Sequence, residues 1–394
     1  MNNVSSSNSQ KALVPELRFP EFKDELQQSK LSDISVYKTK RATDVKSHYI
    51  STENLLQNCM GIVPNTDETA IDGISFSIND ILLGNIRPYL KKAWLAEFDG
   101  VCSTDVLVLH PLKIEPSYFK YLICRDKFFT YVMSSAKGSK MPRGDKAFIM
   151  DMAISLPSIN EQKKLASMLT LIDTLISKQE KLVDELKLYK RGLVFSLFKE
   201  NNVFNSPVER LPLSTLLTEY KNKNSAGLRV CSVAVNKGVV DQVEHLGRSF
   251  SANDTSKYNQ VKQGDIIYTK SPTGDFPFGI VKQNKLNEVV AVSPLYGVYT
   301  PKNYEVGNLL HHYFEQHQNA NNYIKPLAQK GAKNTINITN QNFLAGNVLF
   351  PKNSNDIVKM SQAFETIQKQ IEYNELLHNQ LILTKSYFLQ KMFI

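Results

Sequence analysis

The sequence predicts an α+β fold with an internal repeat. Two β-rich mixed α/β domains are joined by two long antiparallel helices that form a coiled-coil spacer. Residues 160–198 and 355–393 align with each other without gaps and have helical patterns. Weaker similarities precede each of them in the same order, among short apolar runs punctuated by Gly, Asn, Asp and Pro. This repeat predicts a pseudo-twofold relation between the two halves of the chain.

Length and composition favour a folded soluble protein with a polyanionic partner. The chain has 394 residues, 42% of them hydrophobic, and 47 Lys and Arg against 38 Asp and Glu, a net charge of +9. Its 4 cysteines form no CxxC pair, so neither a zinc site nor a disulfide framework is expected. We expect no leader, because the first ten residues are rich in Asn and Ser, and no apolar run of membrane-spanning length occurs. We expect a cytoplasmic protein that does not contact a membrane.

The weaker similarities define the β-rich part of each repeat. In both copies a helical segment follows the strands, at 117–134 and at 307–323, and then come a basic glycine loop and a short strand that ends in Pro. The similar segments are 79–82 and 264–267, 101–111 and 291–301, 136–140 and 329–333, and 154–157 and 348–351. Together with the two long helical segments, these make five similarities in one order, which indicate duplication.

The repeat predicts the domain boundaries. Asn160 and Asn355 stand at plausible helix N-caps, just after the prolines that end the last strands. The predicted order is a flexible N-terminus at 1–12, a first β-rich domain at 13–158, a long helix at 159–200, a linker at 201–212, a second β-rich domain at 213–352 and a second long helix at 353–394.

Each long helix has about 40 residues and would extend roughly 60 Å. Apolar residues recur at alternating spacings of four and three, which is typical of a coiled coil and not of a globular surface helix. The polar exceptions Gln179 and Asn374 occupy matching mid-helix positions. In an antiparallel pair these amides would meet and fix the register. Such a spacer would carry one β-rich domain at each end, an arrangement suited to two half-sites at fixed separation.

Three stretches of the chain resemble a known family. They are LPSINEQKKLASMLTLID at 156–173, DILLGNIRPYLKKAWLAEFDGVCSTDVLVL at 80–109 and PELRFPEF at 15–22. From about residue 14 onward the sequence resembles the specificity subunits of type I restriction–modification systems. The second β-rich domain departs more from the family, because Lys270-Ser271-Pro272-Thr273 replaces Asn85-Ile86-Arg87-Pro88 and lacks the arginine. Residue roles are therefore less transferable in that domain.

The resemblance implies partners and a division of labour. It implies two target-recognition domains, each reading one half of a bipartite site in double-stranded DNA. It implies that the helices dock two modification (methyltransferase) subunits, which use S-adenosylmethionine to methylate adenine, and that restriction (motor-nuclease) subunits can join. S-adenosylmethionine, ATP and Mg are then expected on those partner subunits, with no cofactor on this chain.

Basic clusters provide the candidate DNA contacts. We favour the glycine loops, because glycine lets the backbone approach phosphates, Arg143 can fork onto a guanine edge and Asn334 suits adenine. A loop lysine is more often simply solvated, and Arg87 before Pro88 has an alternative role as a brace between strands. The candidates are Lys38, Lys40, Arg41, Lys46, Arg87, Tyr89, Lys91, Lys92, Lys137, Lys140, Arg143 and Lys146 in the first domain, and Lys221, Lys223, Arg248, Lys270, Lys330, Lys333 and Asn334 in the second.

Catalytic motifs are not found in the sequence. No GxxxxGK[ST] phosphate loop, no Asn-Pro-Pro-Tyr or Asp-Pro-Pro-Tyr run and no HExxH occurs. The run Glu161-Gln162-Lys163 has nuclease-like spacing but lies at a helix start, where acidic residues favour the helix dipole. His311, His312 and His317 lack the i, i+4 spacing of metal ligands. We therefore expect no catalytic residue and no metal.

Two other interpretations stay open from the residues alone. One is a non-catalytic coiled-coil scaffold that binds proteins but has no DNA specificity; the basic glycine loops in both copies argue against it. The other is the recognition part of a single-chain restriction enzyme, against which the missing catalytic motifs argue.

Overall fold

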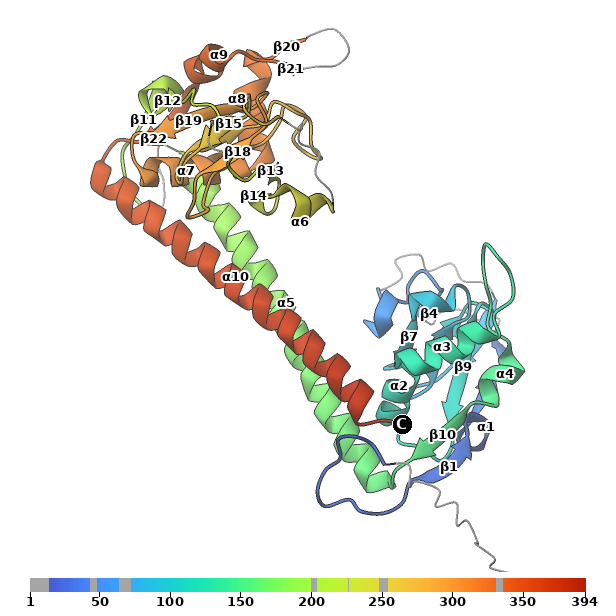
Figure 1. The fold of residues 1–394 in the computed structure, drawn as a ribbon. Helices are drawn as coiled ribbons and strands as arrows, with labels where there is room; N and C mark the ends of the chain where they lie inside the picture. The colour runs from blue at the N-terminus through green and yellow to red at the C-terminus, as the bar shows by residue number, and fades with distance from the viewer. Residues whose placement is uncertain are drawn as a thin grey trace, which may run out of the picture. The chain divides into compact units, whose positions relative to one another are not determined.

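The computed structural model describes residues 14–42, 48–63, 72–199, 204–225, 227–247, 254–330 and 336–394 (Figure 1). The chain forms two compact units, Met1–Glu180 with Leu376–Ile394, and Lys181–Glu375. Two long helices, α5 (Ile159–Leu197) and α10 (Ser354–Lys391), each contribute one half to each unit. Each unit therefore combines a β-rich part with two half-helices from different parts of the sequence. None of the described helices combines the length and the hydropathy that a membrane span requires.

The first unit contains two four-stranded sheets, in the orders β2-β9-β6-β7 and β3-β5-β8-β4, and a ribbon of β1 and β10. Its strands are β1 (Gln27–Lys30), β2 (Ser35–Lys38), β3 (Arg41–Ala42), β4 (His48–Ile50), β5 (Gly73–Phe76), β6 (Ile81–Gly84), β7 (Ala93–Leu95), β8 (Gly100–Cys102), β9 (Val106–Pro111) and β10 (Ala153–Leu156). Its short helices are α1 (Leu31–Ile34), α2 (Pro116–Ile123), α3 (Asp126–Ser134) and α4 (Lys146–Met150), with 3-10 turns at Gln57–Cys59 and Pro88–Leu90.

The second unit has a four-stranded sheet in the order β12-β19-β16-β17 and four two-stranded pairs, β11-β22, β13-β14, β15-β18 and β20-β21. Its strands are β11 (Val208–Pro212), β12 (Leu217–Glu219), β13 (Cys231–Ala234), β14 (Gly238–Asp241), β15 (Asn259–Val261), β16 (Ile266–Tyr268), β17 (Val281–Gln283), β18 (Val290–Val292), β19 (Gly297–Pro301), β20 (Gln329–Lys330), β21 (Ile336–Asn337) and β22 (Asn347–Pro351). Its helices are α6 (Gln242–Leu246), α7 (Tyr304–Glu315), α8 (His317–Ile324) and α9 (Asn340–Ala345), with 3-10 turns at Leu213–Thr215 and Lys325–Leu327.

The duplication predicted from the sequence is present in the structure down to single hydrogen bonds. The sheet order β2-β9-β6-β7 repeats as β12-β19-β16-β17. Before β6 and β16 the chain turns through Asn79 (φ 71°) and Gly264 (φ 89°). The next residues, Asp80 and Asp265, each accept a hydrogen bond on a side-chain oxygen from the backbone amide three residues earlier, at 2.7 and 2.8 Å. The same backbone turn therefore starts the same strand in both units.

The four-stranded sheet that recurs in both units is buried on both faces. In the first unit Ile81 packs with α2, α3 and the long helices, whereas the next residue, Leu82, packs with the second sheet. Ile266 and Ile267 divide in the same way in the second unit. Because successive strand residues point to opposite faces, burial on both faces explains the uninterrupted apolar runs in these strands.

In each unit the two half-helices run antiparallel. In the first unit Arg18 forms two hydrogen bonds of 2.8 Å with Glu161 near the start of α5, and Leu17 donates to the carbonyl of Lys391 at the end of α10. Farther along, Asp173 pairs with Lys385 at 2.6 Å. In the second unit Lys187 contacts Glu375 and Lys190 contacts Gln368, so α10 again runs backward along α5. Glu161 is buried and held by an arginine, which gives it a structural role.

The predicted helix N-caps are wrong. Asn160 and Asn355 lie inside the helices; Ser158 caps α5 through the amides of Glu161 and Gln162, and Asn353 caps α10. The predicted linker 201–212 also contains β11, which pairs with β22 over its whole length. This ribbon is largely solvent-exposed along β11, so it lacks the apolar alternation by which a half-buried strand is recognised.

Candidate nucleic-acid interface

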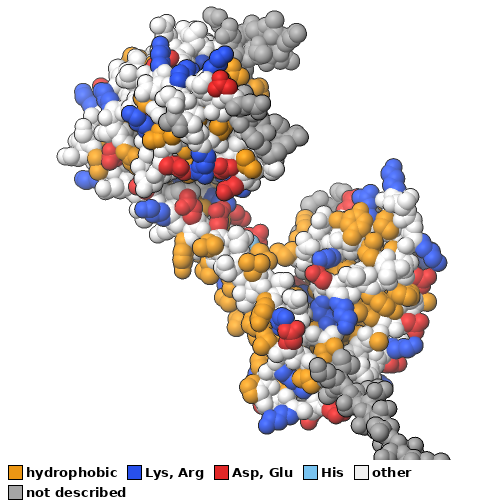
Figure 2. All heavy atoms as spheres, in the orientation of Figure 1, with side chains coloured by type: hydrophobic (Ala, Val, Ile, Leu, Met, Phe, Trp, Pro, Cys, Tyr) orange, Lys and Arg blue, Asp and Glu red, His pale blue; other side chains and the backbone are white. Residues whose placement is uncertain are grey.

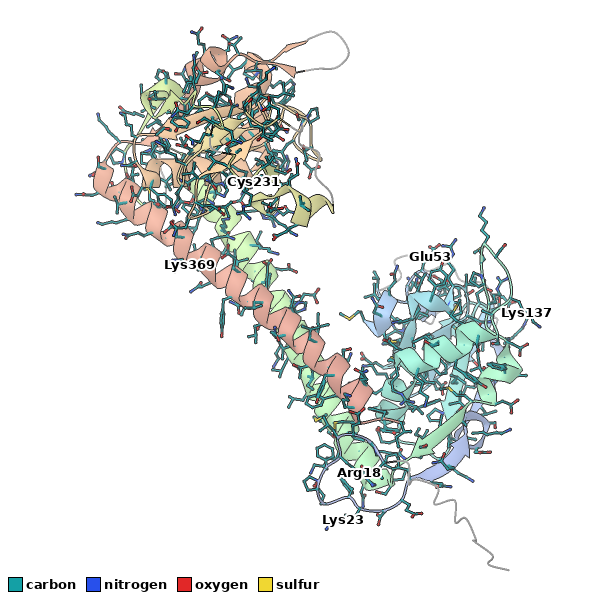
Figure 3. The ribbon with its side chains drawn as sticks, viewed as in Figure 1. Arg18, Lys23, Glu53, Lys137, Cys231 and Lys369 are labelled. Carbon is teal, nitrogen blue, oxygen red and sulfur yellow. The ribbon has the colours of Figure 1, made fainter. Side chains whose placement is uncertain are left out.

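In each unit the candidate basic residues gather at one end of the four-stranded sheet. Strands β2 and β6 both run antiparallel to β9, so their C-terminal ends meet the N-terminal end of β9. Lys38 ends β2, and the amide of Asn85, just after β6, donates to the carbonyl of Asp105, just before β9, at 3.0 Å. Figure 3 shows the loop that carries Lys137 on the side of the first unit away from Arg18.

Two groups of candidate residues of the first unit, those at 87–92 and those at 137–146, are in direct contact. The basic loop around Gly138 is a hairpin, in which Lys137 and Arg143 exchange two backbone hydrogen bonds of 3.0 Å. The amide of Arg87 donates to the carbonyl of Pro142 at 2.8 Å. Gly138 has φ 103°, a backbone conformation that favours glycine. The base of the hairpin is thus held against the turn after β6.

Arg143 is the oriented cation of this hairpin. One of its terminal nitrogens lies 3.0 Å from a carboxylate oxygen of Asp105, while 54% of its side chain stays exposed. A guanidinium has five N–H groups, so one ion pair leaves others free for an acceptor. Lys137 and Lys140 are exposed beside it. Asp105 was not singled out from the sequence, although the similarity of 101–111 to 291–301 included it.

The turn after β6 is strained. Arg87 and Lys91 have φ 52°, in the left-handed region, on either side of the Pro88–Leu90 turn. The Nε of Arg87 is buried and has no hydrogen-bond partner among the described residues. Lys91 pairs with Asp126 at 2.6 Å, and Tyr89 is exposed between the two strained residues. The backbone of Arg87 thus holds the hairpin, while the role of its side chain, toward DNA or as a brace between strands, stays a prediction.

The candidate residues at 38–46 have more contacts within the protein. Lys38 donates at 2.6 Å to Asp80, whose side chain is fully buried, and His110 lies 2.7 Å from the other oxygen of the same carboxylate. Arg41 pairs with Asp72 at 3.1 Å on the surface. Lys40 is exposed, and Lys46 lies outside the described residues. Lys38 therefore has a structural partner that any DNA phosphate would have to share.

The second unit links two predicted residues through a polar chain. Lys270, at φ 55°, donates to the side-chain oxygen of Asn340 at 2.7 Å. The amide of Asn340 donates to Glu219 at 2.7 Å, and Lys221 lies 3.2 Å from the same carboxylate. Burial lowers the pKa of Lys270, and the nearby charge of Glu219 opposes this shift. Lys221 and Lys270 therefore also lie at one end of the four-stranded sheet, the end where β12 and β16 finish.

Four other predicted residues of the second unit have no described side-chain geometry. Lys333, Asn334 and Arg248 lie outside the described residues, as does the side chain of Lys330. Gln179 and Asn374 belong to different units, and the expected meeting of their amides stays a prediction.

In the second unit, Glu315 joins two of the histidines considered in the sequence to form a cluster of ionisable groups that the sequence analysis did not predict. The potential ligand atoms of His311, His312 and Glu315 all lie within 4.8 Å of one another. Lys190 of α5 lies 2.6 Å from Glu315, and Lys282 of β17 lies 3.7 Å from it. Burial opposes ionisation of Glu315, but His312, His311 and the two lysines hold its pKa well below the usual value. Two ammonium groups beside one carboxylate fit an ion-pair network that ties α5 to α7 better than a cation site.

The helices also expose large apolar side chains, which Figure 2 shows as hydrophobic surface along α5 and α10. Isolated exposed residues are ordinary, whereas large contiguous apolar patches are typical of interaction surfaces. In the first unit they are Ile159, Leu171, Leu175, Leu376, Leu377, Ile382, Leu383 and Tyr387. In the second unit they are Leu182, Leu188, Tyr189, Phe195, Val358 and Tyr373.

Comparisons with known proteins agree with these features. Residues 24–188 match the family described as type I restriction modification DNA specificity domain. Over 150 residues, 38% of this chain, the sequence is 29% identical to the type I restriction enzyme MjaVIII specificity subunit of Methanocaldococcus jannaschii. The match covers 34% of that protein, so the chain spans about a third of the length of the curated relatives it matches.

Solved structures share the fold. The S subunit of the type I restriction–modification system of M. genitalium has a TM-score of 0.62 at 12% identity, covering 97% of this chain and 99% of that one. A chain from a study of complex assembly and conformational transition of the type I system has a TM-score of 0.51 at 13% identity, covering 94% and 98%. The resemblance seen in the sequence is therefore confirmed: residues 24–188 match the type I restriction modification DNA specificity domain, and the chain as a whole shares the fold of the M. genitalium S subunit.

Proposed function

We propose that this chain is the DNA-sequence-specificity subunit of a type I restriction–modification complex. It recognises a bipartite site in double-stranded DNA, one half with each unit, and has no catalytic activity of its own. The observation that carries the proposal is the repetition of one sheet whose same end gathers basic residues in both units, Arg143 and Lys140 in the first and Lys221 and Lys270 in the second.

The charge and geometry of these ends suit a duplex. Exposed lysines provide salt-dependent phosphate contacts, whereas an oriented arginine can form a bidentate contact with guanine. The net charge of +9 supports the same partner. The two sheet ends carry different side chains, which supports recognition of a different DNA sequence in each half-site.

The partners in this proposal are two modification (methyltransferase) subunits and the restriction (motor-nuclease) subunits. The exposed apolar residues of α5 and α10 support docking of partner helices, because such a series on a helix suits helix-to-helix packing. S-adenosylmethionine, ATP and Mg would be bound by those partners, where methylation and cleavage occur.

The test is selection from a randomised duplex library by the full chain, alone and together with the modification subunit of its host. We expect enrichment of one motif made of two conserved parts with an unconserved spacer. Methylated adenines should also be mapped genome-wide with and without the gene. We expect methylation at the same motif to be lost when the gene is absent. If no duplex is retained while the modification subunit still binds, the chain is a protein-interaction scaffold and the proposal is wrong.

A further inference from the structure

One turn has the same backbone in both units but presents different side chains. It precedes β9 at residues 103–106 and β19 at residues 293–296. In the first, Val106 donates to the carbonyl of Ser103 at 2.9 Å and Asp105 donates to the Ser103 hydroxyl at 3.3 Å. In the second, the amide of Tyr296 donates to the carbonyl of Ser293 at 3.1 Å and the amide of Leu295 donates to the Ser293 hydroxyl at 3.3 Å. The residue third in the turn is Asp105 in one unit and Leu295 in the other.

Both turns lie at the sheet end that carries the basic residues. The first contacts that cluster directly, because Asn85 donates to the carbonyl of Asp105 and Asp105 pairs with Arg143. The second lies beside the loop after β12, since the amide of Tyr220 donates to the carbonyl of Val298 at 2.8 Å and Lys221 follows. The residue third in the turn therefore has the same place in both candidate interfaces.

The turn of the second unit is rigid. The side-chain amide of Asn259 donates toward three of its carbonyls, those of Ser293, Pro294 and Tyr296, at 3.3, 3.5 and 2.9 Å. Lys223 in turn donates to the side-chain oxygen of Asn259 at 2.6 Å. A buried asparagine thus fixes the turn and places an ammonium group next to it.

Leu295 is 73% exposed on this rigid turn. No collapse of the loop can bury it, because the backbone is held on both sides. In the major groove the C5-methyl group of thymine is the apolar feature of the base edges, and apolar side chains recognise it. A leucine on a fixed turn beside lysines suits such a contact.

We propose that these two equivalent turns are specificity-determining elements: Leu295 contacts a thymine methyl group in one half-site, and Asp105 positions Arg143 toward a guanine edge in the other. The inference rests on the proposed function, because it requires that the sheet ends face DNA. It adds that one turn position sets a base preference in each unit. Asp105 acts through Arg143 and is a positioning residue.

The test compares motifs selected from the randomised duplex library by the full chain with its modification subunit. Leu295→Ala should weaken the thymine preference at one position of one half-site roughly fourfold, the value of about one buried methyl group. Replacing that thymine by uracil should cost the wild type the same factor and the variant nothing. Asp105→Ala should relax a guanine position in the other half-site by about tenfold, and Asp105→Glu should restore part of it.

Matched controls are Val243→Ala, an exposed apolar residue of α6, and Asp151→Ala, an exposed carboxylate paired with Lys30. Both should leave the motif unchanged. If the wild type selects no motif, the proposed function fails. If it selects a motif that Leu295→Ala and Asp105→Ala reproduce with equal stringency, the function stands and this inference is wrong. Loss of modification-subunit binding by Leu295→Ala, with an unchanged motif, would likewise overturn it.

Discussion

Lys385 on α10 forms an ion pair of 2.6 Å with Asp173 on α5 in the first unit. The equivalent residues of the repeat, Lys190 and Gln368, are joined at 2.8 Å in the second. The same inter-helix contact thus occurs once in each unit. The lysine belongs to α10 in the first unit and to α5 in the second. Duplication preserved the lysine and changed its acceptor, from a carboxylate in one unit to an amide in the other, where Glu315 supplies the negative charge.

Asp173→Asn should destabilise the first unit. The carboxylate accepts from Lys120 at 3.1 Å and from the hydroxyl of Tyr121 at 2.8 Å as well as from Lys385. The amide would leave two partly buried ammonium groups without a counter-charge. Since the site is partly exposed, we expect a loss of about 1–3 kcal/mol in the free energy of unfolding, measured by urea denaturation.

The control is Lys187→Ala, which removes an exposed pair with Glu375 between the same two helices. It should cost less than about 1 kcal/mol. Burial raises the pKa of Asp173, but the two lysines, with hydrogen bonds from Lys385 and Tyr121, bring it below the usual value. Its contribution is therefore present above about pH 4 and lost as pH falls through the lower folded pKa. Equal stability of wild type and variant at pH 7 would contradict this account.

The second unit should lose stability as pH falls from about 6.5 toward 4. Burial lowers the pKa of His312 to about 4, so the unfolded chain takes up a proton at a higher pH than the folded unit does. His312→Gln removes this group. The variant should be less stable at pH 7 but should lose less on acidification, by on the order of 2 kcal/mol. Urea midpoints between pH 4 and 7 measure the slope, and parallel slopes would exclude His312 as its source.

The helices and the duplication could be predicted from the sequence because both are local or collinear signals. The spacing of four and three identifies α5 and α10, and their equivalent positions Leu169 and Phe364 are both fully buried. The sheet order could not be predicted, since β2 pairs with β9 across a long stretch of chain. Which strands are neighbours depends on packing that propensity does not encode.

For the candidate site, sequence reasoning could predict the basic residues but not the residues that hold them in place. Basic glycine loops marked Arg143 and Lys140, because their composition suits phosphate. The carboxylate that orients Arg143 belongs to Asp105, on a turn 38 residues away. Asn340, which joins Lys270 to Glu219, was likewise invisible, because a lone asparagine carries no pattern. Partners of this kind depend on the fold.

Lys140→Ala should weaken binding of any duplex and flatten its salt dependence. An exposed lysine at a phosphate releases about one counterion, so the slope of log K against log salt should fall by about one. Arg143→Ala should weaken binding and, in addition, reduce discrimination between duplexes. Fluorescence anisotropy across a salt series measures both effects. Lys23→Ala, at an exposed lysine near Arg18 and away from the hairpin (Figure 3), is the control and should change neither. A Lys140→Ala slope equal to that of Lys23→Ala would remove the hairpin from the interface.

Leu171→Glu and Leu383→Glu should each impair binding of the modification subunit. Both leucines are 61% exposed on the helices of the first unit, so a carboxylate there keeps its water in the free chain but must lose it against a partner helix. We expect an unchanged melting temperature and at least a tenfold weaker association, since burying one unpaired charge costs more than about 1.4 kcal/mol. Leu112→Glu, at a leucine 56% exposed in the β-rich part of the same unit, is matched in chemistry and exposure and should bind normally. Equal association for all three variants would place the docking surface elsewhere, whereas a lowered melting temperature would show that the helix residue supports the fold.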